Sequence, residues 1–289
     1  MNKLSRRQFL GKSALGLGSV VLASQIPLDL NADSIPEPVN MPVGFQSWIV
    51  KDTIGKDFPG TLKMVADMGY QSVEMCSPPG YAMLGFGPLM KYKAKEMKQI
   101  INDAGLSWPS SHYGYDELRQ HLDERIEFAK ESGQTQMILS TFGFGKQATI
   151  SDWLKAADEL NVMGLKSKKE GIQMGYHNHD GEFEKIGDTL IYDALMSQFD
   201  PAAVKMQFQV AVIRMGFKAA TYFQKYPGRF ISAHLADWSP EEKKNVPIGK
   251  GIVDWKEFFA TLKTGGVKNF FVEMDKETFK ESADFIHKL

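Results

Sequence analysis

Residues 172–180 read IQMGYHNHD, a short β-rich run that passes abruptly into polar residues. A helix-period segment precedes this run at 150–170, and another follows it at 190–199. Short runs bounded by helical segments are typical of βα units, in which helices cover a parallel sheet. The stretch therefore predicts a strand over 172–177 that places its polar residues at one end of a parallel sheet.

The same alternation of strand and helix extends over the whole segment 41–289. Seven further strands are expected at 43–48, 72–75, 108–112, 136–140, 204–210, 230–235 and 269–273. The remaining helices are expected at 61–68, 89–104, 115–131, 217–226, 254–263 and 276–288. Asp254 can cap the helix that begins there, and Gly265 and Gly266 can end it. Eight such units predict an α/β fold, a single (β/α)8 TIM barrel of the usual length of about 250 residues.

An open doubly wound sheet is the alternative architecture for this alternation. Such a sheet would favour a glycine-rich phosphate-binding loop after the first strand. The segment FQSW at 45–48 contains no glycine. We therefore favour the closed barrel.

Composition restricts the class of protein. Of 289 residues, 43% are hydrophobic and 24% are charged, which excludes a disordered tail, a collagen-like fibre and a multi-span membrane protein. The formal net charge of −1 argues against a nucleic-acid partner, because nucleic-acid binders show a strong basic excess. A single cysteine, Cys76, excludes a disulfide framework and a thiolate metal cluster. Any chemistry must come from His, Asp, Glu, Gln and Lys.

The first 40 residues differ from the rest of the chain. Residues 5–10 read SRRQFL, and a weakly apolar run at 14–23, too short to span a bilayer, ends in VLA. This pattern resembles a twin-arginine (Tat) export signal. It predicts a signal peptide over 1–23, a linker over 24–40, and a periplasmic protein that has no membrane attachment after processing. An amphipathic first helix of the domain is the alternative.

Polar side chains gather where the predicted strands end, and the active sites of TIM barrels lie at that end. They are Glu74, His112, His177, His179, Gln207, Gln209, His234, Asp237 and Glu273. Histidine, carboxylate and amide oxygen suit a divalent cation such as Mn, Co, Zn or Mg. A single histidine could equally fill a core or surface position, whereas the whole set predicts a metal-binding site at the barrel mouth.

Some of the residues at this end are candidates for substrate contact. Glu74 and His112 could position sugar hydroxyls, or they could form a buried salt bridge. Trp48 could stack on a sugar face or simply pack, and Asp237 is a further substrate-binding candidate. The loop GKG at 249–251 resembles a phosphate cradle only weakly, because it lacks the spacing of a P-loop.

Several motifs resemble those of the xylose isomerase-like TIM barrels known as sugar phosphate isomerases/epimerases. They are GFQ at 44–46, SVEM at 72–75, GYHNHDGEF at 175–183, HLADW at 234–238, PIGKG at 247–251, VDW at 253–255 and FVEMD at 271–275. The resemblance covers nearly all of 41–289. It implies a metal-dependent sugar isomerase or epimerase.

The resemblance also implies a set of metal ligands: His177, Gln209, His234 and Glu273. Two positions depart from the family pattern, because His177 replaces an acidic ligand and the sixth strand carries no aspartate. Gln207 or Gln209 would take the place of that aspartate. Glu273 is then the only carboxylate ligand unless Glu182 turns inward.

The expected reaction is removal of the proton next to a sugar carbonyl, with a metal ion stabilising the resulting enediolate. Glu273 is the expected base, with His177 or His179 as its acid partner, and Glu182 is the competing base. A 3-keto-glycoside lyase would begin with the same step and then expel the glycosidic leaving group. A barrel that binds carbohydrate without catalysis is the third hypothesis.

The expected partner is a small-molecule sugar or glycoside. Export favours a substrate without phosphate, because sugar phosphates are cytoplasmic metabolites. A homo-oligomer is compatible with the sequence.

Overall fold

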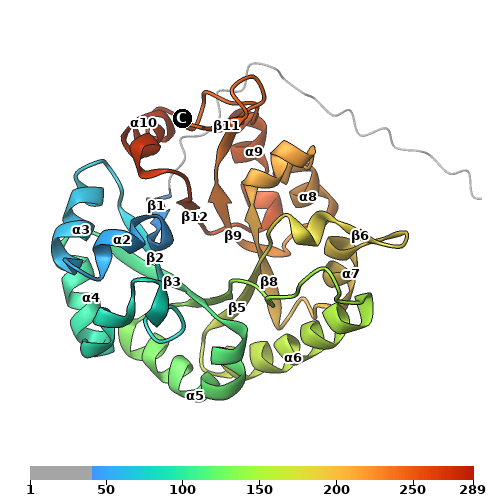
Figure 1. Cartoon of the computed structure of the whole chain (residues 1–289), viewed down its shortest axis with the longest axis horizontal. Helices are drawn as coiled ribbons and strands as arrows, with labels where there is room; N and C mark the ends of the chain where they lie inside the picture. Colours follow the sequence, from blue (N-terminus) through green and yellow to red (C-terminus); the bar gives the residue numbers. More distant parts are fainter. Residues whose placement is uncertain (1–40) are drawn as a thin grey trace, which may run out of the picture. The chain divides into compact units, whose positions relative to one another are not determined.

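Eight parallel strands form a closed barrel in the computed structural model, which describes residues 41–289 (Figure 1). The barrel strands are β1 (Val43–Gln46), β2 (Ser72–Cys76), β3 (Ser107–Tyr113), β4 (Gln136–Leu139), β5 (Gln173–His177), β8 (Val204–Gln209), β9 (Phe230–Leu235) and β12 (Asn269–Val272). They follow one another around the barrel in chain order, and β12 pairs with β1 to close the sheet. The predicted single (β/α)8 barrel is confirmed.

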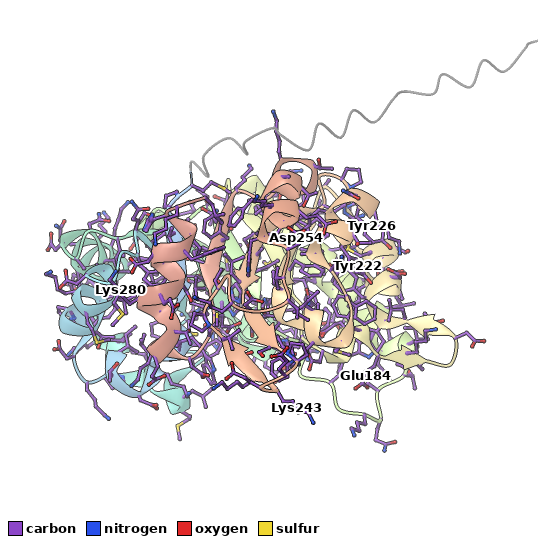
Figure 2. All side chains as sticks on the ribbon, turned by 90° about the horizontal axis from the view of Figure 1, so that it is seen from above. Glu184, Tyr222, Tyr226, Lys243, Asp254 and Lys280 are labelled. Atoms are coloured by element: carbon purple, nitrogen blue, oxygen red, sulfur yellow. The ribbon has the colours of Figure 1, made fainter. Side chains whose placement is uncertain are left out.

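Helices surround the barrel on its outside, as Figure 1 shows. They are α2 (Lys51–Ile54), α3 (Phe58–Ala66), α4 (Ala94–Asp103), α5 (Tyr115–Ser132), α6 (Ile150–Lys169), α7 (Ile191–Gln198), α8 (Ala219–Lys225), α9 (Trp255–Gly265) and α10 (Phe279–Ile286). Asp254, labelled in Figure 2, caps α9 by accepting a hydrogen bond from the backbone N–H of Glu257 at 2.9 Å. Gly266, with φ of +88°, ends this helix. The predicted punctuation of α9 is therefore confirmed.

Three helices begin three or more residues away from their predicted starts, for local reasons. The segment predicted from residue 89 starts as a 3-10 turn, η3 (Gly87–Lys91), which contains Pro88, and becomes α-helical only in α4. The last helix likewise follows a 3-10 turn, η6 (Lys276–Thr278). Helix α3 begins at Phe58 rather than at residue 61, because Asp57 caps it through the backbone N–H of Gly60.

Two short antiparallel hairpins were not predicted. One joins β6 (Lys185–Ile186) to β7 (Thr189–Leu190), and the other joins β10 (Asp237–Ser239) to β11 (Lys244–Val246). Strands of two or three residues give no readable periodicity, which explains why the sequence did not reveal them. Lys243, labelled in Figure 2, lies in the turn of the second hairpin. Its φ is positive, at +52°. The hairpins follow β5 and β9, and the second one carries Asp237.

The layer between barrel and helices is apolar, whereas the barrel interior holds a polar cluster. Phe223 on α8 and Phe230 on β9 pack with their ring centroids 4.7 Å apart. Gly175 on β5 lies so close to β4 that a Cβ there would meet Cδ1 of Ile138 at 2.4 Å. The buried polar side chains that matter below are Glu74, Ser110, Gln207, Ser232 and His234.

The predicted signal peptide (1–23) and linker (24–40) lie outside the described residues. Within 41–289, none of the helices combines the length and the apolar character needed to cross a bilayer.

Candidate active site

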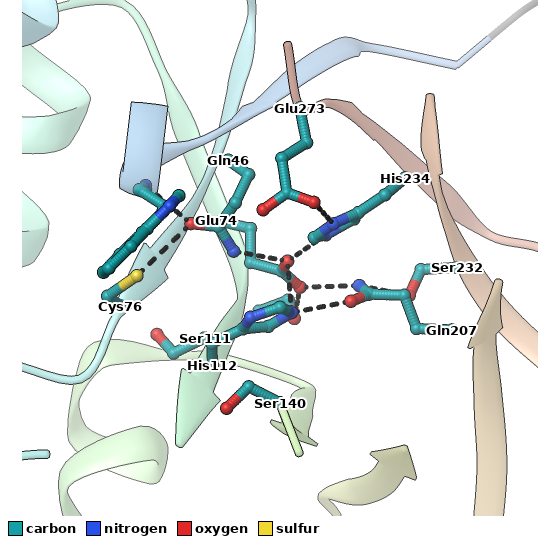
Figure 3. Close-up of polar contacts among 12 residues, drawn as sticks. Gln46, Glu74, Cys76, Ser111, His112, Ser140, Gln207, Ser232, His234 and Glu273 are labelled. Carbon is teal, nitrogen blue, oxygen red and sulfur yellow. Dashed lines mark hydrogen bonds and ion pairs between the residues drawn. The ribbon is translucent and has the colours of Figure 1, made fainter. Parts of the chain in front are cut away.

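Glu74, in the barrel interior, contacts side chains from four other strands (Figure 3). Its Oε2 accepts hydrogen bonds from Nε2 of His234 at 2.6 Å and from Nε2 of Gln46 at 2.8 Å. Nε2 of His112 lies 3.1 Å from the same oxygen. Its Oε1 accepts a hydrogen bond from Nε2 of Gln207 at 2.9 Å. One carboxylate thereby ties β1, β3, β8 and β9 to β2.

The electrostatics of Glu74 follow from this contact set. Burial alone would raise its pKa, but the charges of His112 and His234 and their hydrogen bonds hold the pKa well below its usual range. The hydroxyl of Ser110 donates a further hydrogen bond at 2.5 Å. Glu74 is fully buried, so of its two predicted roles the structure shows the buried salt bridge.

His234 lies between two carboxylates. Its Nε2 contacts Glu74, and its Nδ1 lies 2.9 Å from Oε2 of Glu273. Burial alone would lower the pKa of this imidazole, but the two carboxylates outweigh burial and raise it to about 9. Both ring nitrogens therefore carry protons at neutral pH and donate to the two carboxylates.

Three histidines from three strands converge beside these carboxylates. The ring nitrogens that His112, His177 and His234 offer all lie within 4.8 Å of one another. Burial is the main cause that keeps the pKa of His177 well below its usual range, so this ring is neutral. Its Nδ1 is buried and has no hydrogen-bond partner within 41–289. A buried nitrogen without a partner is costly unless a ligand engages it. The cluster therefore fits a divalent cation that accepts imidazole ligands.

Glu273 follows β12 and supplies a carboxylate next to the three histidines. Its Oε2 accepts hydrogen bonds from Nε2 of Gln209 at 2.6 Å and from Nδ1 of His234. Its Oε1 has no partner among the described residues, and 18% of the side chain is exposed. Burial would raise its pKa, but His234 above all lowers it below the ordinary value. Glu273 is thus an ionised, oriented carboxylate with one oxygen free.

A cavity of about 250 Å³ opens onto this cluster. We call it the mouth cavity; its lining residues are Trp48, Cys76, Tyr81, His112, Ser140, Thr141, His177, His179 and Glu273. The indole of Trp48 packs edge-on against Tyr81, with ring centroids 6.1 Å apart. The lining contains no lysine and no arginine. A neutral polar ligand suits such a lining better than an anion does.

The model of one protein family matches residues 62–289, and its description is "xylose isomerase-like TIM barrel". The chain belongs to this family. The resemblance stated from the sequence motifs is thereby confirmed.

Known proteins similar to this family member include two curated enzymes. Inosose dehydratase from Lacticaseibacillus casei is 25% identical over 168 residues, or 51% of this chain and 55% of that protein. L-ribulose-5-phosphate 3-epimerase UlaE from Salmonella paratyphi C is 39% identical over 62 residues, or 21% of this chain and 22% of that one. The chain thus spans about half the length of the inosose dehydratase and about a fifth of the length of the epimerase.

Among solved structures, a sugar phosphate isomerase/epimerase from Parabacteroides distasonis has the same fold. Its TM-score is 0.70 at 24% identity, and the match covers 86% of this chain and 98% of that one. This likeness supports the barrel architecture.

In this xylose isomerase-like barrel, three of the four expected metal ligands lie together: His177, His234 and Glu273. The side-chain oxygen of Gln209 instead accepts a hydrogen bond from the backbone N–H of Ala211 at 3.2 Å, while its amide nitrogen faces Glu273. The oxygen of Gln207 lies 2.7 Å from Nε2 of His112. The Gln207 oxygen thus contacts the histidine cluster itself, whereas the Gln209 oxygen is turned away from it. His112, expected to contact substrate, takes the third histidine position of the cluster.

Asp237 does not line the mouth cavity, contrary to its predicted role in substrate binding. Its buried carboxylate accepts hydrogen bonds from the backbone N–H groups of Gly249, Gly251 and Val253 and from the indole of Trp255. The amides of the loop 249–253 are therefore occupied by a carboxylate of the chain itself. Asp237 holds this loop in place. The segment 249–251, which weakly resembles a phosphate-binding loop, therefore already binds the Asp237 carboxylate.

Glu182 also lies outside the mouth cavity. One of its oxygens accepts a hydrogen bond from the hydroxyl of Tyr176, and Oε2 accepts one from the backbone N–H of His179 at 2.8 Å. Burial raises the pKa of this carboxyl. Glu182 therefore positions the segment that carries His179, whose side chain lines the mouth cavity.

Sequence reasoning missed several residues of the mouth cavity. Ser140 and Thr141 follow β4, so the rule that strand ends carry the site could have found them. Cys76 ends β2, but a lone cysteine forms no pattern that indicates a site. Tyr81 lies in a loop, where no periodic pattern indicated it.

Proposed function

We propose that the protein is a metal-dependent sugar isomerase or epimerase that removes the proton next to a sugar carbonyl. The observation that carries this proposal is the buried cluster of three histidines beside an ionised glutamate with one free oxygen. The cluster lies under a cavity without cationic side chains. Similarity to an epimerase and to a dehydratase supports chemistry of this kind.

The residues that would hold the metal are His112, His177, His234 and Glu273. A divalent cation bound there supplies Lewis-acid polarisation of the carbonyl, which acidifies the neighbouring C–H. Imidazole-rich ligand sets favour ions such as Zn²⁺ over Mg²⁺, which prefers oxygen ligands. Among Mn, Co, Zn and Mg, we therefore propose Zn or Co.

Glu273 is the proposed base. Its Oε2 is held by His234 and Gln209, so the orientation of the carboxylate is fixed and Oε1 is free to accept a proton. His179 is the proposed acid partner, because both histidines line the cavity but His177 is buried among the prospective ligands. The ring centroids of these two histidines lie 4.7 Å apart, within reach of a short proton transfer path.

We propose further that the substrate carries no phosphate. Phosphate recognition uses arginine, lysine or free backbone amides. The mouth cavity offers no cationic side chain, and Asp237 occupies the amides of the 249–253 loop. The export signal proposed for residues 1–23 agrees with this view, since it would place the protein in the periplasm.

A 3-keto-glycoside lyase is the second candidate. Abstraction of the same proton, followed by loss of the group on the next carbon, would release the glycosidic leaving group. Similarity to inosose dehydratase favours this candidate, since a dehydratase expels a group rather than returning a proton. A barrel that only binds carbohydrate would bind no metal and exchange no protons.

Solvent-deuterium exchange tests the proposal. Free ketoses and 3-keto-glycosides are incubated with the metal-loaded protein in D₂O, and NMR follows the proton next to the carbonyl. The variant Glu273→Gln should abolish exchange while retaining measurable metal, and Glu277→Gln, an exposed glutamate nearby, should behave as wild type. Exchange that survives in Glu273→Gln but is lost in Glu182→Gln would transfer the role of base to Glu182. Products separate the candidates, because only a lyase releases the leaving group.

A further inference from the structure

We propose that the substrate is a glycoside of two sugar units, and that the second unit binds in a hollow beside the mouth cavity. This inference rests on the proposed proton-abstraction chemistry and specifies the substrate class of the same site. The hollow has a volume of about 520 Å³. We call it the side hollow, and the residues that carry the argument are Gly80, Asp116, Gln120, His121, Thr141 and Phe142.

The two spaces adjoin each other at two segments of the chain. Thr141 lines both the mouth cavity and the side hollow. On the opposite segment, Pro79 and Gly80 line the side hollow, and the next residue, Tyr81, lines the mouth cavity. The mouth cavity, at about 250 Å³, falls below the usual range of about 300–1,000 Å³ for small-molecule sites. With the side hollow the site reaches that range, so it has room for more than one sugar ring.

The lining of the side hollow suits a neutral polyol. Gln120, His121 and Asp116 offer both donors and acceptors, and the rings of Tyr115 and Phe142, 5.0 Å apart, give it an apolar side. A pyranose presents hydroxyl groups around its edge and C–H groups on its faces, which matches this mixture.

The charges around the side hollow argue against an anionic ligand. Its arginine, Arg125, lies 3.1 Å from Glu124 and 3.6 Å from Glu117. Asp116 adds a further negative charge to the lining. The guanidinium is therefore compensated by the protein, and a second sugar fits better than a phosphate or a carboxylate.

An irregularity in α5 occurs at the side hollow. His121 has φ of −133° and ψ of 25°, which are not helical values, so the first turns of α5 bend away from the rest. Residues 115–132 contain neither proline nor glycine, which are the common causes of such a break. The bend lies where Gln120 and His121 line the side hollow, and irregular backbone of this kind tends to occur at binding sites.

The opposite wall of the side hollow is fixed before any ligand binds. Gly80 lies so close to Glu117 that a Cβ there would meet its Oε2 at 2.0 Å. The same carboxylate accepts a hydrogen bond from the hydroxyl of Ser77 at 2.5 Å and one from the backbone N–H of Gly114 at 3.2 Å. Glu117 thereby joins the 77–80 segment to the start of α5. Such a preformed wall lowers the ordering cost of binding.

Calorimetry on the metal-loaded protein tests the inference with unreactive probes. The probes are two matched pairs: methyl β-D-glucoside with methyl β-cellobioside, and methyl β-D-galactoside with methyl β-lactoside. We expect the two-unit member of at least one pair to bind about 10-fold more tightly, which corresponds to about 1.4 kcal/mol. Gln120→Trp should fill the hollow and His121→Ala should remove a contact, so both should reduce this ratio. Gln99→Trp, an identical change at an exposed position of α4, should preserve it.

Three results would overturn the inference. They are equal affinities within both pairs, no binding of any of the four probes, and a two-unit preference that persists in both side-hollow variants. Deuterium exchange into the 3-keto form of methyl β-D-glucoside tests the chemistry separately. Exchange without a two-unit preference would refute binding of a second sugar in the side hollow and would leave the proposed function standing. A two-unit preference without exchange would refute the proposed chemistry and would leave the second binding site standing.

Discussion

Raising the pH from 6.5 to 9 should destabilise the metal-free protein through His234. The pKa of this imidazole is about 9 in the folded protein, against an ordinary value of 6.5. Below pH 6.5 the ring is protonated in both the folded and the unfolded state. Between pH 6.5 and 9 only the folded state keeps the proton, so the free energy of unfolding should fall as pH rises. The difference between these two pKa values corresponds to a loss of roughly 3 kcal/mol in the free energy of unfolding for this one group.

Urea unfolding of the chelator-treated protein at intervals across this pH range measures the effect. The variant His234→Gln can still donate one hydrogen bond to a carboxylate but cannot titrate, so its unfolding free energy should change less with pH. NMR of the His234 ring should show that it stays protonated to about pH 9. Equal pH slopes in wild type and variant, or titration of His234 below pH 7, would refute the two-carboxylate explanation.

Metal binding should show the opposite dependence on pH. One ring nitrogen of His234 must lose its proton before it can act as a ligand, and the proton competes with the metal ion. Below pH 9, the apparent affinity for metal should therefore rise about 10-fold per pH unit for a single released proton. Metal titrations at pH 6.5, 7.5 and 8.5 measure this trend, and a pH-independent affinity would exclude His234 from the ligand set.

Three further predictions concern other parts of the chain. His234→Ala should strongly reduce the bound metal measured by elemental analysis, while the exposed control His287→Ala should keep the wild-type metal content. Stoichiometric metal in His234→Ala would contradict the assignment of His234 as a metal ligand. Changing Arg6 and Arg7 together to Lys should trap precursor in the cytoplasm, and fractionation that still finds processed protein outside would count against the export signal. Asp237→Asn should lower the free energy of unfolding by about 2–4 kcal/mol, because an amide N–H₂ donor replaces one carboxylate oxygen and then faces other N–H groups. An unchanged urea midpoint would show that the 249–253 loop does not depend on the Asp237 carboxylate.

The barrel could be predicted from the sequence because its signals are local. Each strand shows itself in four to seven consecutive residues, and the caps of α9 depend on Asp254 and Gly266 alone. The histidines and Glu273 could be assigned to one end of the barrel for the same reason, since a parallel sheet brings all strand ends together.

The partners of each site residue could not be predicted in this way. Whether His112 meets substrate or joins two other histidines depends on strand register, and the pairing of β2 with β3 shifts between Ser72 and Glu74. Asp237 follows a barrel strand as the site residues do, so the sequence does not distinguish it from them. It belongs to the β10–β11 hairpin, whose strands are too short to show a periodic pattern. The inward orientation of Glu74 likewise depends on contacts across the full width of the barrel.

The closure of the sheet has a consequence for the order in which the molecule can be completed. Strand β12 is hydrogen-bonded to β9 on one side and to β1 on the other, so a growing chain cannot close the barrel until its last strand has been synthesised. Glu273 directly follows that strand, whereas Glu74 belongs to the second. The candidate site is therefore complete only when the first and last strands of the barrel have paired. A truncation that removes β12 would leave two unpaired strand edges and a histidine cluster without its outer carboxylate.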